Sequence, residues 1–152
     1  MTGCEAFQRK LVRKSRPKPP PAPIIKFQDY SRSMTPVERY QKHYMLFDYW
    51  NDDLLRALQE GAPNHKRYRR ASEDALTELT VMKDLLQGEA GGRLAPLIEE
   101  RTRLHAQLRS GSLGPTEANA VWRRLETQTR RIHREFFWRD VQEHLKSETP
   151  SP

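Results

Sequence analysis

The residues that could bind a metal or exchange protons are five histidines and several neighbouring carboxylates, in a chain of 152 residues. A metal site on a helix needs two ligands three or four residues apart, because that spacing brings both to one face. The five histidines, none of which has a partner histidine at this spacing, are His43, His65, His105, His133 and His144. The neighbours Asp52 and Asp53, like Glu99 and Glu100, point to different sides of a helix and form no acid–base pair. The sequence therefore predicts no metal site and no catalytic carboxylates.

Short catalytic and nucleotide-binding motifs are also missing from the sequence. It contains no G-x-x-x-x-G-K-[ST] phosphate loop, no G-x-G-x-x-G turn, no G-x-S-x-G nucleophile elbow and no H-E-x-x-H zinc motif. The glycine-rich run GEAGG, residues 88–92, follows a predicted helix rather than a strand, so we interpret it as a connector. Cys4 is the one cysteine, which excludes a cysteine-rich zinc site and an internal disulfide. We expect a protein that is not an enzyme and needs no cofactor.

Arginines and aromatic rings alternate in VWRRLETQTRRIHREFFWRD, residues 121–140, which holds six arginines. Arginines beside aromatic rings are a pattern that single-stranded RNA recognition uses, through phosphate pairing and base stacking. The same stretch also suits an amphipathic helix with Trp122 and Phe136 in the core. Its arginines then form a solvated face with surface pairs such as Arg131 with Glu135.

Two further segments are basic enough to meet phosphates. HKRYRR, residues 65–70, is predicted to lie in a connection, and residues 1–26 carry seven lysines and arginines against Glu5 alone. The N-terminal segment can contact nucleic acid, serve as a nuclear import signal or a mitochondrial presequence, or keep the chain soluble. The candidate nucleic-acid contacts of the whole chain are Arg9, Lys10, Arg13, Lys14, Arg16, Lys66, Arg67, Arg69, Arg70, Arg123, Arg130, Arg131 and Arg134.

The tetrapeptide RRAS, residues 69–72, has the pattern that a basophilic kinase reads. Ser72 is a good helix cap, and it precedes Glu73 and Asp74, which suit the first turn of a helix. A phosphate on Ser72 would then meet the exposed amides and the positive end of the helix dipole. Ser72 is therefore a phosphorylation candidate.

The elements that position these residues begin with TPVE, residues 35–38, which predicts a helix start. The threonine hydroxyl can accept a backbone amide, the proline tolerates the first turn, and the glutamate can reach back. The helix should end near Glu60, before Gly61 and Pro63. Residues spaced by three and four, with one polar position, predict a seam between helices of the coiled-coil type. This seam consists of Val37, Tyr40, Tyr44, Phe47, Asn51, Leu54 and Leu58.

The same helix carries more aromatic rings than one face can bury. At about 100° per residue, Met45 and Tyr49 fall outside the apolar arc. Interfaces between proteins favour Tyr, Trp and Met. We therefore expect Met45, Tyr49 and Trp50 to bind a protein partner. Trp138 is a further candidate, because it cannot share one buried direction with Phe137 on a helix.

Three more helices are predicted. The second begins at Ser72 and ends at GEAGG, the third has Pro96 near its start and ends at SGSLG, and the fourth extends from about Pro115 to Lys146. No run alternates with a period of two, and the short connections favour antiparallel neighbours. The sequence predicts an all-α fold of about four helices, in an antiparallel bundle or elongated helical hairpins.

The sequence divides into a helical domain and two polar ends. Residues 1–33 form a basic and proline-rich arm in which polyproline II is the expected conformer, residues 34–146 the helical domain, and residues 147–152 a tail. We expect the arm and the tail to be disordered. The apolar residues of the arm, which can fold back on the helices or insert into a partner, are Ile24, Ile25, Phe27 and Tyr30.

The composition narrows the class of function. No apolar run approaches the roughly 18 residues of a membrane-spanning helix, and the lone cysteine favours a reducing compartment. We expect a non-enzymatic adaptor or small structural subunit of an intracellular protein assembly, nuclear or cytoplasmic, with a mitochondrial location still open. It would bind one or more proteins through the aromatic-rich helix, and self-association is also open. The alternative is an RNA- or DNA-associated protein that uses the basic arm and the Arg-rich helix.

Overall fold

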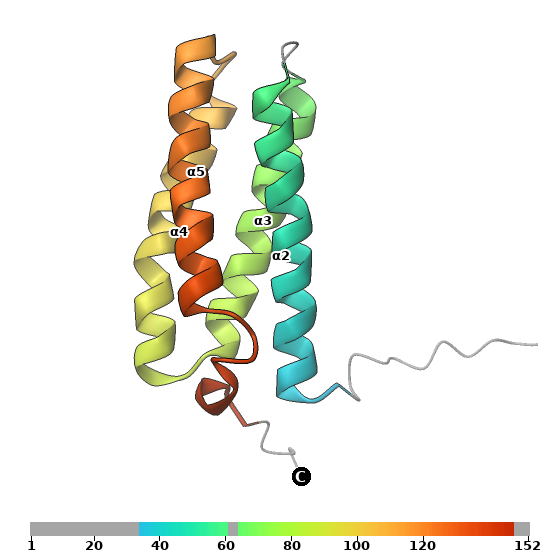
Figure 1. The fold of residues 1–152 in the computed structure, drawn as a ribbon, viewed down its shortest axis with the longest axis vertical. Coiled ribbons are helices and arrows are strands. Elements are labelled where there is room, and N and C mark those ends of the chain that lie inside the picture. The colour runs from blue at the N-terminus through green and yellow to red at the C-terminus, as the bar shows by residue number, and fades with distance from the viewer. Residues whose placement is uncertain (1–33, 61–63, 148–152) are drawn as a thin grey trace, which may run out of the picture.

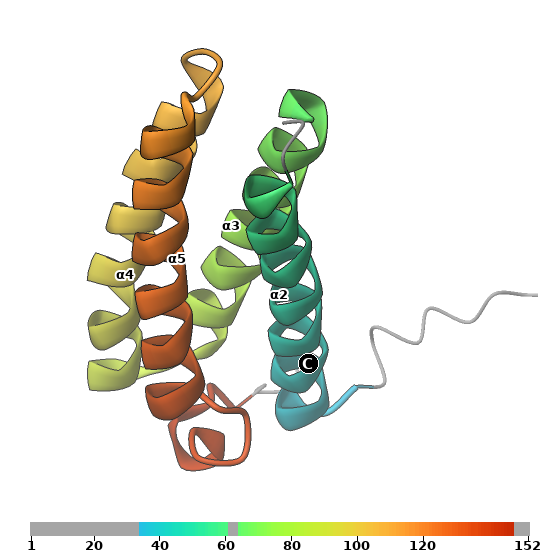
Figure 2. The same ribbon diagram turned by 45° about the horizontal axis from the view of Figure 1, so that its top comes forward.

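The computed structural model describes residues 34–60 and 64–147. Within them the chain forms α2 (Pro36–Gln59), α3 (His65–Leu85), α4 (Gly88–Arg109), α5 (Pro115–Glu135) and a short 3-10 helix, η2 (Gln142–His144). Successive helices run in opposite directions, so that α2 and α3 form one hairpin and α4 and α5 a second (Figure 1, Figure 2). The predicted all-α antiparallel bundle is confirmed, while the predicted arm lies outside the described residues.

Helix α2 begins at the predicted capping box. The Glu38 amide donates to Thr35 Oγ1 at 3.2 Å, and the Thr35 amide donates to Glu38 Oε2 at 2.8 Å. The Glu38 carboxylate accepts from both the amide and the hydroxyl of Thr35, and these two hydrogen bonds lower its pKa. The helix ends at Gln59 with Glu60 as its cap, as predicted. The inner side of α2 packs against α3 and α5, and the Tyr40 hydroxyl donates to the Phe136 carbonyl at 3.0 Å.

The predicted start of the second helix at Ser72 is wrong, because α3 begins at His65. Asn64 caps it by accepting the Arg67 amide at 3.0 Å. The basic residues 65–70 therefore form the first turns of α3 rather than a connection. The helix extends this far because it buries Tyr68 and Ala71 in the core, which the amphipathic pattern from Ser72 onward did not include.

The glycine-rich run GEAGG is not the connector that we predicted but the first turn of α4. Gly88 makes the reversal with a φ of +58°, a conformation that glycine adopts without strain. A Cβ on Gly91 would lie 3.4 Å from the Leu86 carbonyl oxygen, so the absence of a side chain lets α4 approach the end of α3. Pro96 consequently lies inside the helix. Proline has no amide to donate to the Gly92 carbonyl, but Gly92 is exposed, so this carbonyl can bond to water.

Helix α5 ends at Glu135 and not near Lys146 as predicted. The chain then turns back under the bundle, where Phe136, Val141 and Leu145 are buried. Lys146 donates its amide to the Leu85 carbonyl at 2.9 Å, and the Gln87 amide donates to the His144 carbonyl at 2.8 Å. A continued α5 would have left these apolar side chains beyond the end of the other helices, so their burial favours the turn.

The core consists of two hydrophobic clusters stacked along the bundle axis. The lower cluster includes Tyr40, Phe47 and Leu79, and the upper cluster includes Leu54 and Leu125. Polar residues occupy the level between them on every helix. This polar layer consists of Asn51, Ser72, Arg101, Gln128 and Thr129, all buried. The predicted polar position in the α2 seam, Asn51, is thus one member of a layer that crosses the bundle.

Candidate interaction surfaces

An apolar patch lies on the outer side of α2, away from the other helices. It consists of Met45, Leu46 and Tyr49, which line a shallow hollow with Gln41 and Lys42. The side chains of Met45 and Tyr49 are 60% and 63% exposed, and they are the exposed large hydrophobic residues of the described chain. The prediction that both fall outside the buried arc of the helix is confirmed. We call these three residues the α2 patch.

The other predicted protein-binding residues do not join the α2 patch. Trp50 is half-buried and packs against both core clusters, although its ring contacts Tyr49 edge to face with 4.9 Å between centroids. Trp138 is also half-buried against the lower cluster, with the Arg139 guanidinium 4.9 Å from its ring centroid. The arm residues Ile24, Ile25 and Phe27 lie outside the described residues. The sequence therefore located Met45 and Tyr49 on the outside of α2. Trp50 and Trp138, which are also predicted protein contacts, pack partly against the core.

A basic groove follows the junction of α4 and α5. Its apolar floor contains Leu97, and Glu100 and Gln128 lie beside it. Five arginines line the groove, which has a volume of about 530 Å³: Arg123, Arg124, Arg130, Arg131 and Arg134. We call it the arginine groove. Four of its arginines are predicted nucleic-acid contacts, and the fifth, Arg124, was missed although it precedes Arg131 by the seven residues that place both on one side of a helix.

Carboxylates engage some of these arginines but not all. Arg130 pairs with Glu126 at 2.6 Å, and both Arg131 and Arg134 pair with Glu135, at 3.1 and 3.2 Å. The Arg131–Glu135 pair was predicted. Burial acts to raise the pKa of Glu135, but the hydrogen bonds and charges of Arg134 and Arg131 outweigh it and lower that pKa. Arg123 and Arg124 are exposed and have no ion-pair partner among the described residues. Two of the five guanidinium groups are thus free for a ligand.

The basic run at residues 65–70 is largely engaged within the fold. Arg67 bonds Asp53 at 2.6 Å and pairs with Glu60, which raises its pKa. Arg69 donates to the Leu108 carbonyl at 3.2 Å, and Arg70 lies 3.5 Å from Asp74. These bonds hold the start of α3 against α2 and α4, and Lys66 is exposed beside them. The basic arm residues from Arg9 to Arg16 lie outside the described part of the chain.

Ser72 is fully buried inside α3, not at the helix N-terminus that the phosphorylation hypothesis requires. Its hydroxyl lies 3.0 Å from Nδ1 of His105 on α4. Burial lowers the pKa of His105. In this fold a kinase could reach Ser72 only after α3 and α4 had separated.

The polar layer contains a fully buried guanidinium with few partners. Arg101 donates to Asn51 Oδ1 at 2.9 Å, and its Cζ lies 5.5 Å from the centroid of the Phe47 ring. Its Nε and Nη1 atoms have no hydrogen-bond partner among the described residues. Asn51 in turn donates to Thr129 Oγ1 at 2.9 Å. Burial lowers the pKa of Arg101 to about 9, although the charge of Glu100 acts in the opposite direction.

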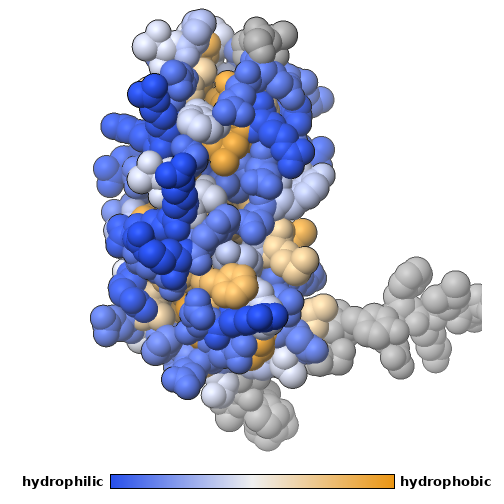
Figure 3. Space-filling view, viewed as in Figure 1, coloured by the Kyte–Doolittle hydropathy of each residue, from blue (hydrophilic) through white to orange (hydrophobic). Residues whose placement is uncertain are grey.

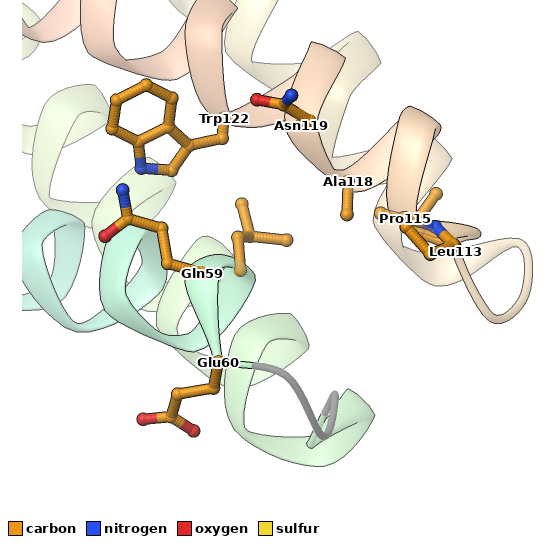
Figure 4. Close-up of a pocket in the computed structure, with 8 residues that line it drawn as sticks. Gln59, Glu60, Leu113, Pro115, Ala118, Asn119 and Trp122 are labelled. Carbon is orange, nitrogen blue, oxygen red and sulfur yellow. The ribbon is translucent and has the colours of Figure 1, made fainter.

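A second groove lies at the other end of the bundle, between the end of α2 and the start of α5. Figure 4 shows the Trp122 indole on α5 facing Gln59 on α2, with Ala118 and Pro115 further along α5. Trp122 Nε1 is buried without a hydrogen-bond partner in the described chain. Trp122 was predicted to lie in the core, and in the structure its side chain is half-buried.

The described residues contain no cluster of three or more histidine, cysteine or acidic side chains that could hold a metal ion. No helix in the same residues has the length and apolarity to span a bilayer. The face of the molecule seen in Figure 3 is mainly hydrophilic, with small hydrophobic patches between charged side chains. Comparisons with protein family models, curated proteins and solved structures found no match to this chain.

Proposed function

We propose that this protein is a non-enzymatic adaptor or small structural subunit that binds a protein partner through the α2 patch. The observation that carries the proposal is the exposure of Met45 and Tyr49, 60% and 63%, on a bundle whose other large apolar side chains are buried or half-buried in the described residues. Burying a methionine side chain contributes about 1.5–3 kcal/mol, and an aromatic ring contributes at least as much. Leaving both in water is costly unless a partner covers them.

The spacing of the exposed residues indicates the kind of partner. Lys42, Met45 and Tyr49 lie at positions i, i+3 and i+7 of α2, and Asp52 and Arg56 continue the row. This is the anchor spacing of a helix that lies in an apolar groove of another protein. The flanking charges would then contact the polar rim of that groove. The partner is therefore a protein with an apolar groove one helix wide, and its rim carries charges of both signs.

The α2 patch alone is small for a stable interface. A standard interface buries about 800 Å² on each partner, more than three side chains supply. The arm joins the chain directly before α2, and its apolar residues Ile24, Ile25 and Phe27 are near enough in sequence to add to the same interface. We propose that they do so, which would enlarge the contact without using the core.

Comparative affinity capture tests this proposal. The full-length tagged protein, a Met45→Ser/Tyr49→Ser variant and a Thr102→Ser/Gln107→Ser control would be recovered from cells of the source species, with nuclease and a high-salt wash. The control changes two exposed residues of α4. We expect at least one protein in near-stoichiometric amount with the wild type and the control, reduced tenfold or more with the patch variant. Equal recovery with all three would overturn the proposal.

A further inference from the structure

We propose that the arginine groove binds the phosphate backbone of single-stranded RNA, with Arg123 and Arg124 supplying the free cations. The groove lies on the second hairpin, so this activity is separate from the binding of a protein by α2. Five guanidinium groups on one helix, spread between Arg123 and Arg134, cover about 16 Å of helix length at 1.5 Å per residue. A single small anion could contact only part of such a row. The row therefore suits a polymer with regularly repeated negative charges.

The location of the positive charge supports a polyanion. The chain has a net charge of +7, and residues 1–26 alone account for +6, so the rest of the protein is close to neutral. The arginines of the groove thus concentrate cations on an otherwise balanced body. A polyanion that occupies the groove could extend to the basic arm, which would add phosphate contacts outside the described residues.

The side chains that line the groove favour one strand over a duplex. Guanidinium groups beside an apolar floor can contact both phosphates and bases, and only an unpaired strand leaves its bases available. The guanidinium planes can then pair with phosphates and stack on unpaired bases.

The floor of the groove favours ribose over deoxyribose. Gln128 is 3% exposed, and its Nε2 donates to the Leu97 carbonyl at 2.9 Å and to Glu100 at 3.3 Å. Its Oε1 accepts no hydrogen bond from the described residues. Such an oxygen requires a donor. A ribose 2′-hydroxyl can supply this donor once the Gln128 side chain turns toward the groove, and deoxyribose has no such donor.

The test measures binding of a fluorescent 20-nucleotide single-stranded RNA to the full-length protein. Arg123→Gln/Arg124→Gln removes the two free cations. Arg93→Gln/Arg109→Gln removes the same charge from α4, where both side chains are exposed and neither lines the groove. Each lost phosphate contact lowers the salt exponent by about 0.7 for a single strand, so the groove variant should bind roughly 25-fold more weakly at 0.1 M salt. Its plot of log K against log salt should be flatter by about 1.4.

Three results would overturn the proposal. The first is an equal loss of affinity in the groove variant and the charge-matched control, which would indicate general charge attraction. The second is displacement of the RNA by polyglutamate as effectively as by unlabelled RNA, which would indicate an acidic protein ligand. The third is equal affinity for DNA of the same sequence, which would contradict the ribose contact. Circular dichroism spectra of the variants should match the wild type, because every substituted arginine is exposed.

Discussion

The inner and outer sides of α2 carry similar residues in opposite surroundings. On the inner side Phe47 is 0% exposed and packs in the lower cluster, while two residues away Tyr49 is 63% exposed on the α2 patch. Both rings belong to the same helix and differ only in the direction that helical geometry gives them. The difference teaches that aromatic content alone does not define a core. On the inner side the ring stabilises the fold, and on the outer side we propose that it stabilises a complex with a partner.

The largest expected difference between the two sides is in stability. Phe47→Ala should lower the free energy of unfolding by about 3–5 kcal/mol, because it leaves a cavity in a packed cluster. It would also remove the ring that faces the Arg101 guanidinium. Urea unfolding followed by circular dichroism measures the change. A loss below about 1 kcal/mol would show that the inner side is not the core that we describe.

The polar position on the inner side gives the next largest effect. Asn51→Leu should destabilise the fold by about 2–3 kcal/mol, because Arg101 would lose its one hydrogen bond to a side chain while remaining buried. Adding Arg101→Met should recover most of that loss, since the combined change replaces the pair with apolar groups. A double-mutant cycle by urea unfolding measures the coupling. Additive effects of the two substitutions would contradict the contact.

A smaller effect concerns the edge between the two sides of α2, where Asp48 contacts His133 of α5. The hydrogen bond that His133 Nε2 donates to the Asp48 carboxylate raises the pKa of His133. Because the pKa of His133 is higher in the folded state, the contact contributes its full stabilisation below the unfolded pKa of about 6.5. This contribution disappears as the pH rises through the pKa of the folded state. Both side chains are partly exposed, so the contribution is below about 1 kcal/mol.

Asp48→Asn should therefore lower stability at pH 5.5 and change it less at pH 8.5. Thermal unfolding at the two pH values measures this difference, and His133→Gln serves as a control that should remove the pH dependence in both backgrounds. A loss that is equal at the two pH values would show that the contact is not an ion pair.

A small effect on stability is also expected at the α2 patch. Met45→Ser should change the free energy of unfolding by no more than about 0.5 kcal/mol, since exposed positions without special contacts rarely exceed this. Tyr49→Ser should cost about 0.5–1 kcal/mol, because it also removes the edge contact with Trp50. Differential scanning calorimetry of the double variant measures the sum. A large destabilisation would show that the patch supports the fold, which would remove the contrast with Phe47.

Local signals with a definite geometry could be read from the sequence. The capping box at Thr35 and the 3–4 spacing of the α2 seam involve residues close in the chain, and both were confirmed. The same geometry placed Met45 and Tyr49 on the outside. The apolar stripe of a helix thus predicts which residues are left over as well as which are buried.

The limits of α3, α4 and α5 depended on residues far apart in sequence. The α3 start at His65 depends on burial of Tyr68 among residues of other helices, and the end of α5 at Glu135 depends on a turn that packs against Leu85 and Leu86. Local propensity does not contain these contacts. Glycines in GEAGG suggested a break, yet the close approach at Gly91 needs a glycine inside the helix.

The buried Arg101 and the groove arginines show that residue type alone does not predict where an arginine lies. Arg101 occupies a position that continues the series Leu94, Leu97, Leu104 and Leu108 at spacings of three and four, and this register is the signal that could have revealed its burial. The number of arginines in a segment does not indicate which of them lie in register with the apolar residues. The grouping of five of them in one groove became visible only when α4 and α5 were placed side by side.

The measurement that most directly tests the central claim is site-specific photocross-linking from the outer side of α2. Tyr49 would be replaced by a benzophenone amino acid in the full-length protein within its own cells, and Gln107 on α4 would be replaced in a matched control. We predict one dominant adduct with a different protein from position 49 and none of that mass from position 107. An adduct only within the chain, only with a second copy, or equally from both positions would contradict the account.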